Sequence, residues 1–419
     1  MAAGLARLRR LLRPAANWAI EQTPGGGEAK DCNGPDRPRK TGGPARRFHE
    51  RGSRHGARNP LPAARTALAA LIGCRTRLLA LLASGLCFTG AGAVPLQVFA
   101  QSYKPEYRLS TAVGPAYPWG KGADIWAQLV KERTAGRISI KQFPGAAALA
   151  GDPAREFAAL RDGTIDLAVG SSLNWAAQVK ALNLFALPFM VGEHRALDAL
   201  LRGEVGAAVL RAVEAAGVVP LAWGDNDFRE ISTTQRSLHG PLDLAGLRIR
   251  VSASPLIDDV LAAFGAIPQR MKWLDAQKAM LAGTIDGQET TAQTFVAAKA
   301  HTLGQKHLTL WALAADPLVF AVSRVAWDGW TAADREIVRQ AALDAASRES
   351  DLARRAAATA EAAITRELKD AGVIVTRLTP DERAAFAAAA RPVFEKWASE
   401  AGADLVTRAQ EAISASRKP

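Results

Sequence analysis

The chain has 419 residues, of which 48% are apolar and 22% are charged. This balance is typical of globular proteins and excludes a chain that is disordered throughout, collagen-like or held together mainly by disulfides. The length predicts two to three domains. The formal net charge of +12 would favour a nucleic-acid or anionic-membrane partner if it were spread over the whole chain.

The positive charge is confined to the first hundred residues. Residues 1–100 hold 16 of the 53 Lys and Arg residues and 5 of the 41 Asp and Glu residues. The remaining 37 basic and 36 acidic residues leave the chain from Gln101 onward nearly neutral, so no nucleic-acid partner is expected. All three cysteines also precede residue 100, which excludes a disulfide, a thiolate metal site or a cysteine nucleophile from the rest of the chain.

Residues 66–100 have the features of a secretory signal peptide. Two arginines precede an apolar run that begins at Leu78, and small residues lead to Ala100, where we expect cleavage. The alternative is an uncleaved anchor, but the strongly apolar part is well under the ~20 residues that a spanning helix needs. Lipid attachment at Cys74 is a weaker alternative, because only a short apolar run precedes it. We therefore predict an exported, periplasmic protein.

Residues 1–65 precede this leader and are rich in Arg, Gly and Pro, with little apolar periodicity. Such a composition cannot bury a core and predicts a disordered basic extension. The alternative is a chain start placed too far upstream.

After Gln101, short β-type runs alternate with longer helical runs, an order that builds a mainly parallel sheet covered by helices. We expect strands at residues 107–112, 138–143, 165–169, 218–223 and 247–251. We expect helices at residues 121–135, 152–161 and 193–216. The predicted fold class is therefore α/β.

One short pattern occurs twice. Residues 163–166 and 283–286 both read Gly-Thr-Ile-Asp and follow an apolar helix end. A glycine just past a helix can adopt the left-handed conformation that closes it, and the β-branched pair then starts a strand. Two such units about 120 residues apart predict two domains of similar plan. A chance match of small, common residues is the alternative.

Residues 331–371 predict a single long helix. The segment is rich in Ala, Glu and Arg, contains no Pro or Gly, and begins with the capping pattern Thr-x-x-Asp. At 1.5 Å per residue such a helix would run roughly 60 Å, enough to bridge two lobes. A break at residues 341–347 is the alternative. Residues 379–416 predict further amphipathic helix.

Catalytic motifs are missing from the part of the chain after Gln101. It contains no nucleophile elbow, phosphate-binding loop or zinc-protease motif, and its four histidines are dispersed. We therefore expect neither an enzyme nor a cofactor. An exported α/β protein without catalytic groups is most economically a binding protein. A secreted enzyme is the less favoured alternative.

Residues 243–251 (DLAGLRIRV), followed by residues 283–289 (GTIDGQE), resemble the solute-binding proteins of tripartite ATP-independent periplasmic (TRAP) transporters, the DctP-type family. The resemblance covers about residues 107–408. It is strengthened by matching stretches in the expected order, at residues 136–140, 185–189 and 223–229.

The resemblance implies two α/β lobes hinged around a cleft, with a long helix spanning both. Lobe I would comprise residues 104–226 and 316–355, and lobe II residues 227–315 and 356–412. It also implies that a small organic acid bound in the cleft is delivered to the membrane subunits of a TRAP permease. A periplasmic sensor that presents the bound acid to a receptor is the alternative.

Arg250 is the residue that the resemblance identifies as the partner of the ligand carboxylate. The physical argument is independent of the family. A guanidinium presents parallel N–H donors that match both carboxylate oxygens, and it keeps its charge. An arginine in an apolar strand would also be costly to bury unpaired. The alternative is an internal salt bridge to an acidic side chain.

Other ligand contacts are implied with less support. Arg229 matches a second family arginine, although Arg236 competes for that role. Thr290 stands where relatives often carry an Asn, and Ser171 and Ser172 stand where some relatives place an acidic contact. The candidate aromatic residues of the cleft are Tyr117, Trp119, Trp175, Phe185, Trp223 and Trp273, each of which has core packing as its alternative. No metal site is expected, with Glu289 the one candidate for a cation ligand.

Overall fold

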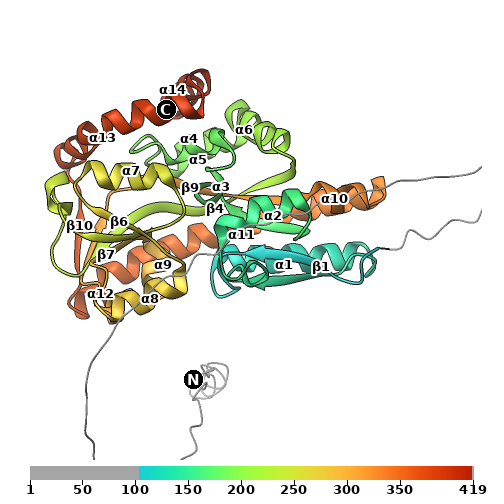
Figure 1. Cartoon of the computed structure of the whole chain (residues 1–419), viewed down its shortest axis with the longest axis horizontal. Coiled ribbons are helices and arrows are strands. Elements are labelled where there is room, and N and C mark those ends of the chain that lie inside the picture. Colours follow the sequence, from blue (N-terminus) through green and yellow to red (C-terminus); the bar gives the residue numbers. More distant parts are fainter. Residues whose placement is uncertain (1–102, 418–419) are drawn as a thin grey trace, which may run out of the picture. The chain divides into compact units, whose positions relative to one another are not determined.

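The computed structural model describes residues 103–417. The predicted leader and basic extension lie outside the described residues. Within residues 103–417, ten strands form one mixed sheet with helices packed around it (Figure 1). The predicted α/β class is thereby confirmed. In the part of the chain that the structure describes, no helix is long and apolar enough to cross a bilayer.

The sheet consists of two halves that meet at β4. The first half has the strand order β2-β1-β3-β9-β4, and the second has β6-β5-β7-β4, with β8 and β10 added beside β4. Its strands are β1 (Tyr107–Thr111), β2 (Ile140–Pro144), β3 (Leu167–Ser171), β4 (Val218–Thr233), β5 (Arg248–Val251), β6 (Ile267–Arg270), β7 (Gly287–Thr291), β8 (His307–Leu310), β9 (Ala315–Ser323) and β10 (Ile374–Arg377).

The repeated Gly-Thr-Ile-Asp segments occupy equivalent places in the two halves. Gly163 and Gly283 both have positive φ and close a helix, as predicted. Asp166 then accepts a hydrogen bond from the Arg108 main-chain nitrogen at 2.9 Å. Asp286 accepts one from the Arg248 main-chain nitrogen at the same distance. Each aspartate thereby ties the start of one strand, β3 or β7, to its parallel neighbour, β1 or β5.

The predicted strands differ from the observed ones at their ends. β3 begins two residues later than expected, and β4 continues to Thr233 rather than stopping at Trp223. β4 is longer because it pairs with β9 in the first half and then with β7 and β8 in the second. Its register shifts between Asp225 and Phe228, where Asp227 has a φ of +65°. An irregular backbone therefore separates the two halves of β4.

Helices cover the sheet and its edges. Those of residues 103–215 are α1 (Pro118–Arg133), α2 (Glu156–Asp162), α3 (Ser172–Trp175), α4 (Asn183–Ala186), α5 (His194–Arg202) and α6 (Glu204–Ala215). Those that follow are α7 (Pro255–Ala263), α8 (Trp273–Leu281), α9 (Ala292–Ala297), α10 (Arg324–Asp328), α11 (Ala332–Thr365), α12 (Glu367–Asp370), α13 (Pro380–Ala401) and α14 (Ala403–Ser416). Short 3-10 turns lie between them, among them Ala147–Leu149 and Pro153–Arg155.

The long helix α11 contacts both halves of the molecule. It packs on α1 and β4 and, toward its carboxyl end, on α9 and α12. The Thr331 hydroxyl accepts a hydrogen bond from the Asp334 main-chain nitrogen at 3.1 Å, so the predicted cap is present. The helix is continuous from Ala332 to Thr365, which contradicts the alternative of a break at residues 341–347.

Two other predicted helices are each divided in two at a glycine. Gly203 separates α5 from α6, and Gly402, with a φ of +109°, separates α13 from α14. The division lets α14 pack on both α5 and α13. In Figure 1, α13 and α14 lie beside α4, α5 and α7, at the edge of the molecule away from α1.

Candidate functional site

Arg250 lies on β5, with its guanidinium buried and without an acidic partner. Its strand neighbours Ile249 and Val251 are fully buried in the core, and the Arg250 residue is only 8% exposed. Its Nε and Nη2 atoms each donate to the Met271 main-chain oxygen at 3.2 Å. Within residues 103–417, the ion pairs of the structure include none to Arg250. The structure therefore contradicts the alternative that Arg250 forms an internal salt bridge.

The Trp273 ring and the buried setting both affect the charged Arg250 side chain. The Arg250 guanidinium carbon lies 5.8 Å from the centre of the Trp273 ring, close enough for a cation–π interaction. Burial lowers the pKa of Arg250 to about 10, against an opposing effect of Glu289. The group still carries its charge at neutral pH. A carboxylate placed against it would supply the charge-assisted hydrogen bonds that burial has removed.

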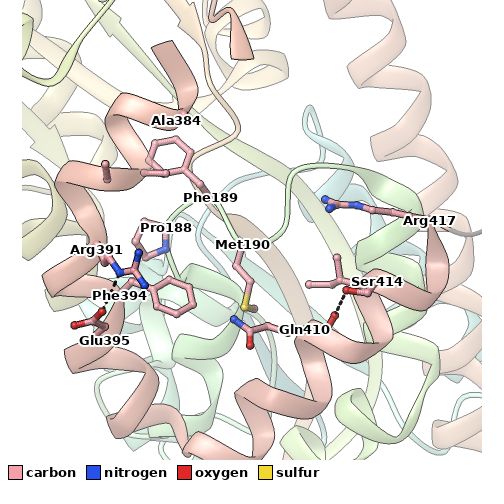
Figure 2. Close-up of a pocket in the computed structure, with 13 residues that line it drawn as sticks. Pro188, Phe189, Met190, Ala384, Arg391, Phe394, Glu395, Gln410, Ser414 and Arg417 are labelled. Carbon is pink, nitrogen blue, oxygen red and sulfur yellow. Dashed lines mark hydrogen bonds and ion pairs between the residues drawn. The ribbon is translucent and has the colours of Figure 1, made fainter. Parts of the chain in front are cut away.

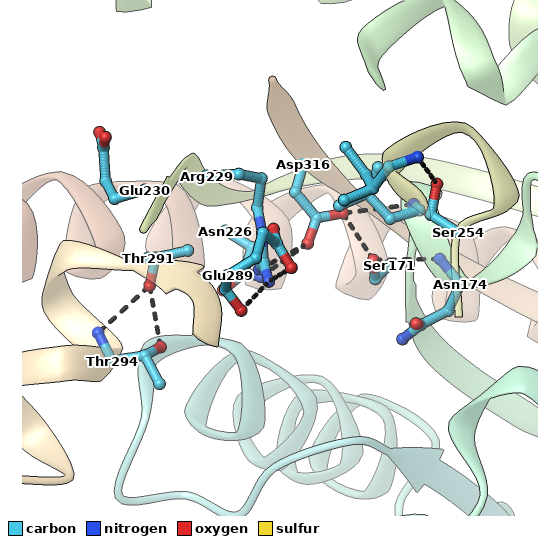
Figure 3. A network of polar contacts seen from close by, with 12 residues as sticks. Ser171, Asn174, Asn226, Arg229, Glu230, Ser254, Glu289, Thr291, Thr294 and Asp316 are labelled. Carbon is cyan, nitrogen blue, oxygen red and sulfur yellow. Dashed lines mark hydrogen bonds and ion pairs between the residues drawn. The ribbon is translucent and has the colours of Figure 1, made fainter. Parts of the chain in front are cut away.

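Arg229, by contrast, is fully engaged by acidic side chains (Figure 3). It lies on β4, and its Nε and Nη2 atoms donate to the two carboxylate oxygens of Glu289 on β7, the Nη2 contact measuring 2.9 Å. Its Nη1 atom lies 3.5 Å from Asp316 on β9. Burial alone would lower the pKa of Arg229, but these two carboxylates raise it. A direct contact between Arg229 and a ligand stays a prediction.

Asp316 connects Arg229 to the end of β3 (Figure 3). One of its oxygens accepts hydrogen bonds from the Ser171 hydroxyl at 2.5 Å and from the Ser172 hydroxyl at 3.2 Å. The other accepts the Asn226 side-chain nitrogen at 2.8 Å. Burial raises the pKa of Asp316, while Arg229 acts to lower it. The two predicted serines therefore face a carboxylate of the protein itself.

Sequence reasoning missed Asp316, although a signal was present. The residue interrupts an apolar run that becomes β9, and a charged side chain in a buried strand needs a partner. Sequence reasoning also missed Asn174, which lies between the two predicted residues Ser172 and Trp175. The Asn174 residue is 7% exposed, and no hydrogen bond joins its side-chain amide to another described residue. In Figure 3 this amide points away from the network.

Glu289 and Thr290 are both buried on β7. Glu289 is engaged by Arg229, which is the structural role weighed against cation binding. Thr290 lies opposite Glu230 in the antiparallel pair of β7 with β4, and its contact with a ligand stays a prediction. In residues 103–417, no group of three or more His, Cys, Asp or Glu side chains could hold a metal ion.

The predicted aromatic residues divide between the core and the surroundings of Arg250. Trp175 is fully buried, packs edge-on against Phe157 and lies over Gly170. Phe185 packs edge-on against Trp223 with ring centres 5.3 Å apart. Of the six candidates, Trp273 is the one in contact with the Arg250 guanidinium. The roles of Trp175, Phe185 and Trp223 as ligand contacts stay predictions.

Two pockets lie apart from this polar network. One, of about 720 Å³, opens between α13, α14 and the loop at residues 188–190 (Figure 2) and contains none of the predicted ligand residues. The other, of about 350 Å³, lies between the start of α1, α9 and α11. Tyr117 and Gln293 line the second pocket, whose walls come from a helix beside each half of the sheet and from the long helix.

Comparisons with known proteins place this chain in one family. The family model for bacterial extracellular solute-binding protein, family 7 (DctP) matches residues 109–400. A TRAP periplasmic solute-binding protein from Ralstonia eutropha H16, solved with bound (S)-2-acetolactate, is 52% identical, with a TM-score of 0.72 over 75% of this chain and 100% of that chain. One from Sulfurospirillum deleyianum, solved with bound succinate, is 27% identical, with a TM-score of 0.68 over 73% of this chain and 98% of that chain.

A relative identified by sequence similarity supports the same family. An uncharacterized protein of Sinorhizobium fredii is 30% identical over 70% of this chain, and the match spans 52% of that relative's own length. The resemblance found at residues 243–251 and 283–289 is thus confirmed, together with the two-lobed fold that it implied. The chain belongs to the DctP family, the bacterial extracellular solute-binding proteins of family 7.

Proposed function

We propose that the protein captures a small organic acid between its two lobes and delivers it to the membrane subunits of a TRAP permease. The single observation that carries this proposal is the setting of Arg250, a buried guanidinium that no carboxylate of residues 103–417 neutralises. The solved relatives support it, because one holds acetolactate and another holds succinate. We place the protein in the periplasm, consistent with the predicted leader and with its family.

The proposed lobes comprise residues 104–226 with 316–355 and residues 227–315 with 356–412. The backbone supports these boundaries. The chain first passes from one proposed lobe to the other at the irregular stretch of β4 between Asp225 and Phe228. It passes between them a second time at the start of β9, beside Asp316. The third passage lies within α11, which contacts both halves of the sheet. Two strands and one helix would therefore form the hinge, and a ligand that contacts both lobes would favour the closed form.

The test is acid binding by variants of one strand, measured by titration calorimetry against a panel of organic acids. Arg250→Ala should abolish binding while the protein stays folded. Arg250→Lys should also weaken binding markedly, because an ammonium group cannot reproduce the planar fork. Arg248→Ala is the matched control, since Arg248 lies on the same strand but pairs with Asp286 at the surface. Unchanged affinity in Arg250→Ala would refute the assignment.

A further inference from the structure

One of the two buried guanidiniums in the cluster around Arg250 is paired with carboxylates, and the other is not. Two buried guanidiniums, those of Arg229 and Arg250, lie beside two buried carboxylates, those of Glu289 and Asp316. Arg229 uses its donors on both carboxylates, whereas Arg250 donates only to a main-chain oxygen. The cluster therefore offers an incoming anion the guanidinium of Arg250, while the guanidinium of Arg229 is already paired.

The other cations on the neighbouring segments are also engaged. Arg248 on β5 donates to both oxygens of Asp286 at 2.9 Å. Arg270 on β6 pairs with Asp258. Lys272, which follows β6, donates from Nζ to the Ala150 main-chain oxygen at 2.7 Å. A second anionic group that reached these segments would have to break one of these contacts to obtain a cation from them.

We infer that the site takes an acid with a single carboxylate and discriminates against dicarboxylates. This inference rests on the proposed function and narrows its substrate class. One carboxylate would take up the donors of Arg250, which have no carboxylate partner among residues 103–417. A second would be buried near Glu289 and Asp316, so it would lose its hydration and meet like charges instead of a partner.

Pairs of acids that differ by one carboxylate test the inference. In each pair, titration calorimetry with the full chain compares a monocarboxylate with its dicarboxylate counterpart. The pairs are butanoate and succinate, 2-hydroxybutanoate and malate, and 2-hydroxy-2-methylbutanoate and 2-hydroxy-2-methylbutanedioate. For every pair that binds, we expect the dissociation constant of the monocarboxylate to be at least tenfold lower.

The two possible failures are distinguishable. A dicarboxylate that binds as tightly as its monocarboxylate partner, with affinity lost in Arg250→Ala, overturns the inference and leaves the proposed function standing. Binding of no acid from either set overturns the proposed function together with the inference.

Variants of the two carboxylates test the cause of the discrimination. Glu289→Gln removes one negative charge and releases Arg229, so the preference for the monocarboxylate should fall at least fivefold. Asp316→Asn provides a second test should Glu289→Gln fail to fold. Glu230→Gln is the matched control. It also replaces a buried carboxyl group in the second half of the sheet. Glu230, however, accepts hydrogen bonds from the Trp311 and Ala312 main-chain nitrogens and points away from the network in Figure 3. An unchanged preference in both folded test variants would overturn the inference.

Discussion

Lys272 and Ala150 are joined by a hydrogen bond of 2.7 Å that links the two proposed lobes. The Ala150 carbonyl belongs to the turn that follows β2, and Lys272 belongs to the segment that follows β6. The residue before Lys272 provides the oxygen that Arg250 contacts, and the residue after it is Trp273. Three consecutive residues therefore hold the predicted ligand-binding arginine and bridge the proposed lobes, so we expect the proposed closure to be coupled to the position of Arg250.

Lys272→Ala should weaken acid binding without removing the carboxylate contact. A hydrogen bond of this kind contributes about 0.5–1.5 kcal/mol, so the dissociation constant should rise about two- to twelvefold. Titration calorimetry measures the change. The control is Lys278→Ala, because Lys278 is an exposed lysine on α8, which starts directly after Lys272. Equal affinity of Lys272→Ala and the unchanged protein would show that this bond does not contribute to closure.

Glu349 on α11 should tolerate an amide but not a truncation. Its carboxylate accepts the Asp225 main-chain nitrogen at 2.8 Å, and its stem packs against Gly122. Burial raises the pKa of Glu349 well above its usual value and so favours the neutral acid, which an amide resembles. We expect Glu349→Gln to change the free energy of unfolding by less than about 1 kcal/mol. Glu349→Ala should lower it by about 2–3 kcal/mol, because it leaves a buried N–H unpaired and a cavity.

Urea denaturation of both Glu349 variants measures these changes. The comparison of the two variants is itself the control, since both remove the carboxylate and only one keeps an acceptor of the same shape. Equal losses of stability in Glu349→Gln and Glu349→Ala would mean that the ionised carboxylate, rather than the hydrogen bond, holds Asp225 against the helix.

Local patterns predicted those parts of the fold that depend on neighbours in sequence. The cap at Thr331 and the run of good helix formers were sufficient for α11, because helix propensity and capping are local. The two glycines at 163 and 283 were sufficient for the repeated unit, because each adopts the left-handed conformation that the pattern required. The glycine breaks at 203 and 402 were missed, since a glycine in an Ala-rich run weakens a helix without ending it.

The polar network depended on long-range pairing and was only partly predictable. Arg229 and Glu289 are 60 residues apart, and their contact follows from the antiparallel register of β4 with β7. The apolar run of β9 is buried along its whole length and therefore lacks the alternation that identifies a strand. Arg250 was selected because the family motif and the chemistry of its side chain pointed to the same position, and its role as a ligand contact stays a prediction.

Gly170→Ala should destabilise the protein through Trp175. A β-carbon at position 170 would lie 2.0 Å from the Trp175 ring, so the ring would have to leave its place over β3. Overpacking of this kind lowers the free energy of unfolding by about 1–3 kcal/mol. Gly240→Ala is the control, since nothing lies within 4 Å of its β-carbon and its backbone is extended. Equal melting temperatures for the two variants would show that Trp175 is free to move, as a residue lining an open cleft would be.

Stability should fall as the pH rises from about 5 to 8, in part because of Glu156. Its carboxyl group is fully buried and accepts the Ser110 hydroxyl at 2.7 Å, while its other oxygen has no partner among the described residues. Burial raises the pKa of Glu156 from 4.5 to about 8, against the opposing effect of Ser110. The folded state therefore holds a proton that the unfolded state has released, and the stabilisation from that proton is complete below pH 4.5 and is lost as the pH approaches 8.

The variant Glu156→Gln should remove this contribution, because the amide keeps an acceptor for Ser110 and has no proton to lose. One such group makes the free energy of unfolding fall by at most about 1.4 kcal/mol per pH unit, so the variant should show a shallower slope between pH 5 and 8 in urea denaturation. The slope should not vanish, since burial also raises the pKa of Glu230 to about 8. Parallel pH profiles for the variant and the unchanged protein would mean that Glu156 stays ionised when buried, and the Ser110 hydroxyl would then be stabilising a charge rather than a neutral acid.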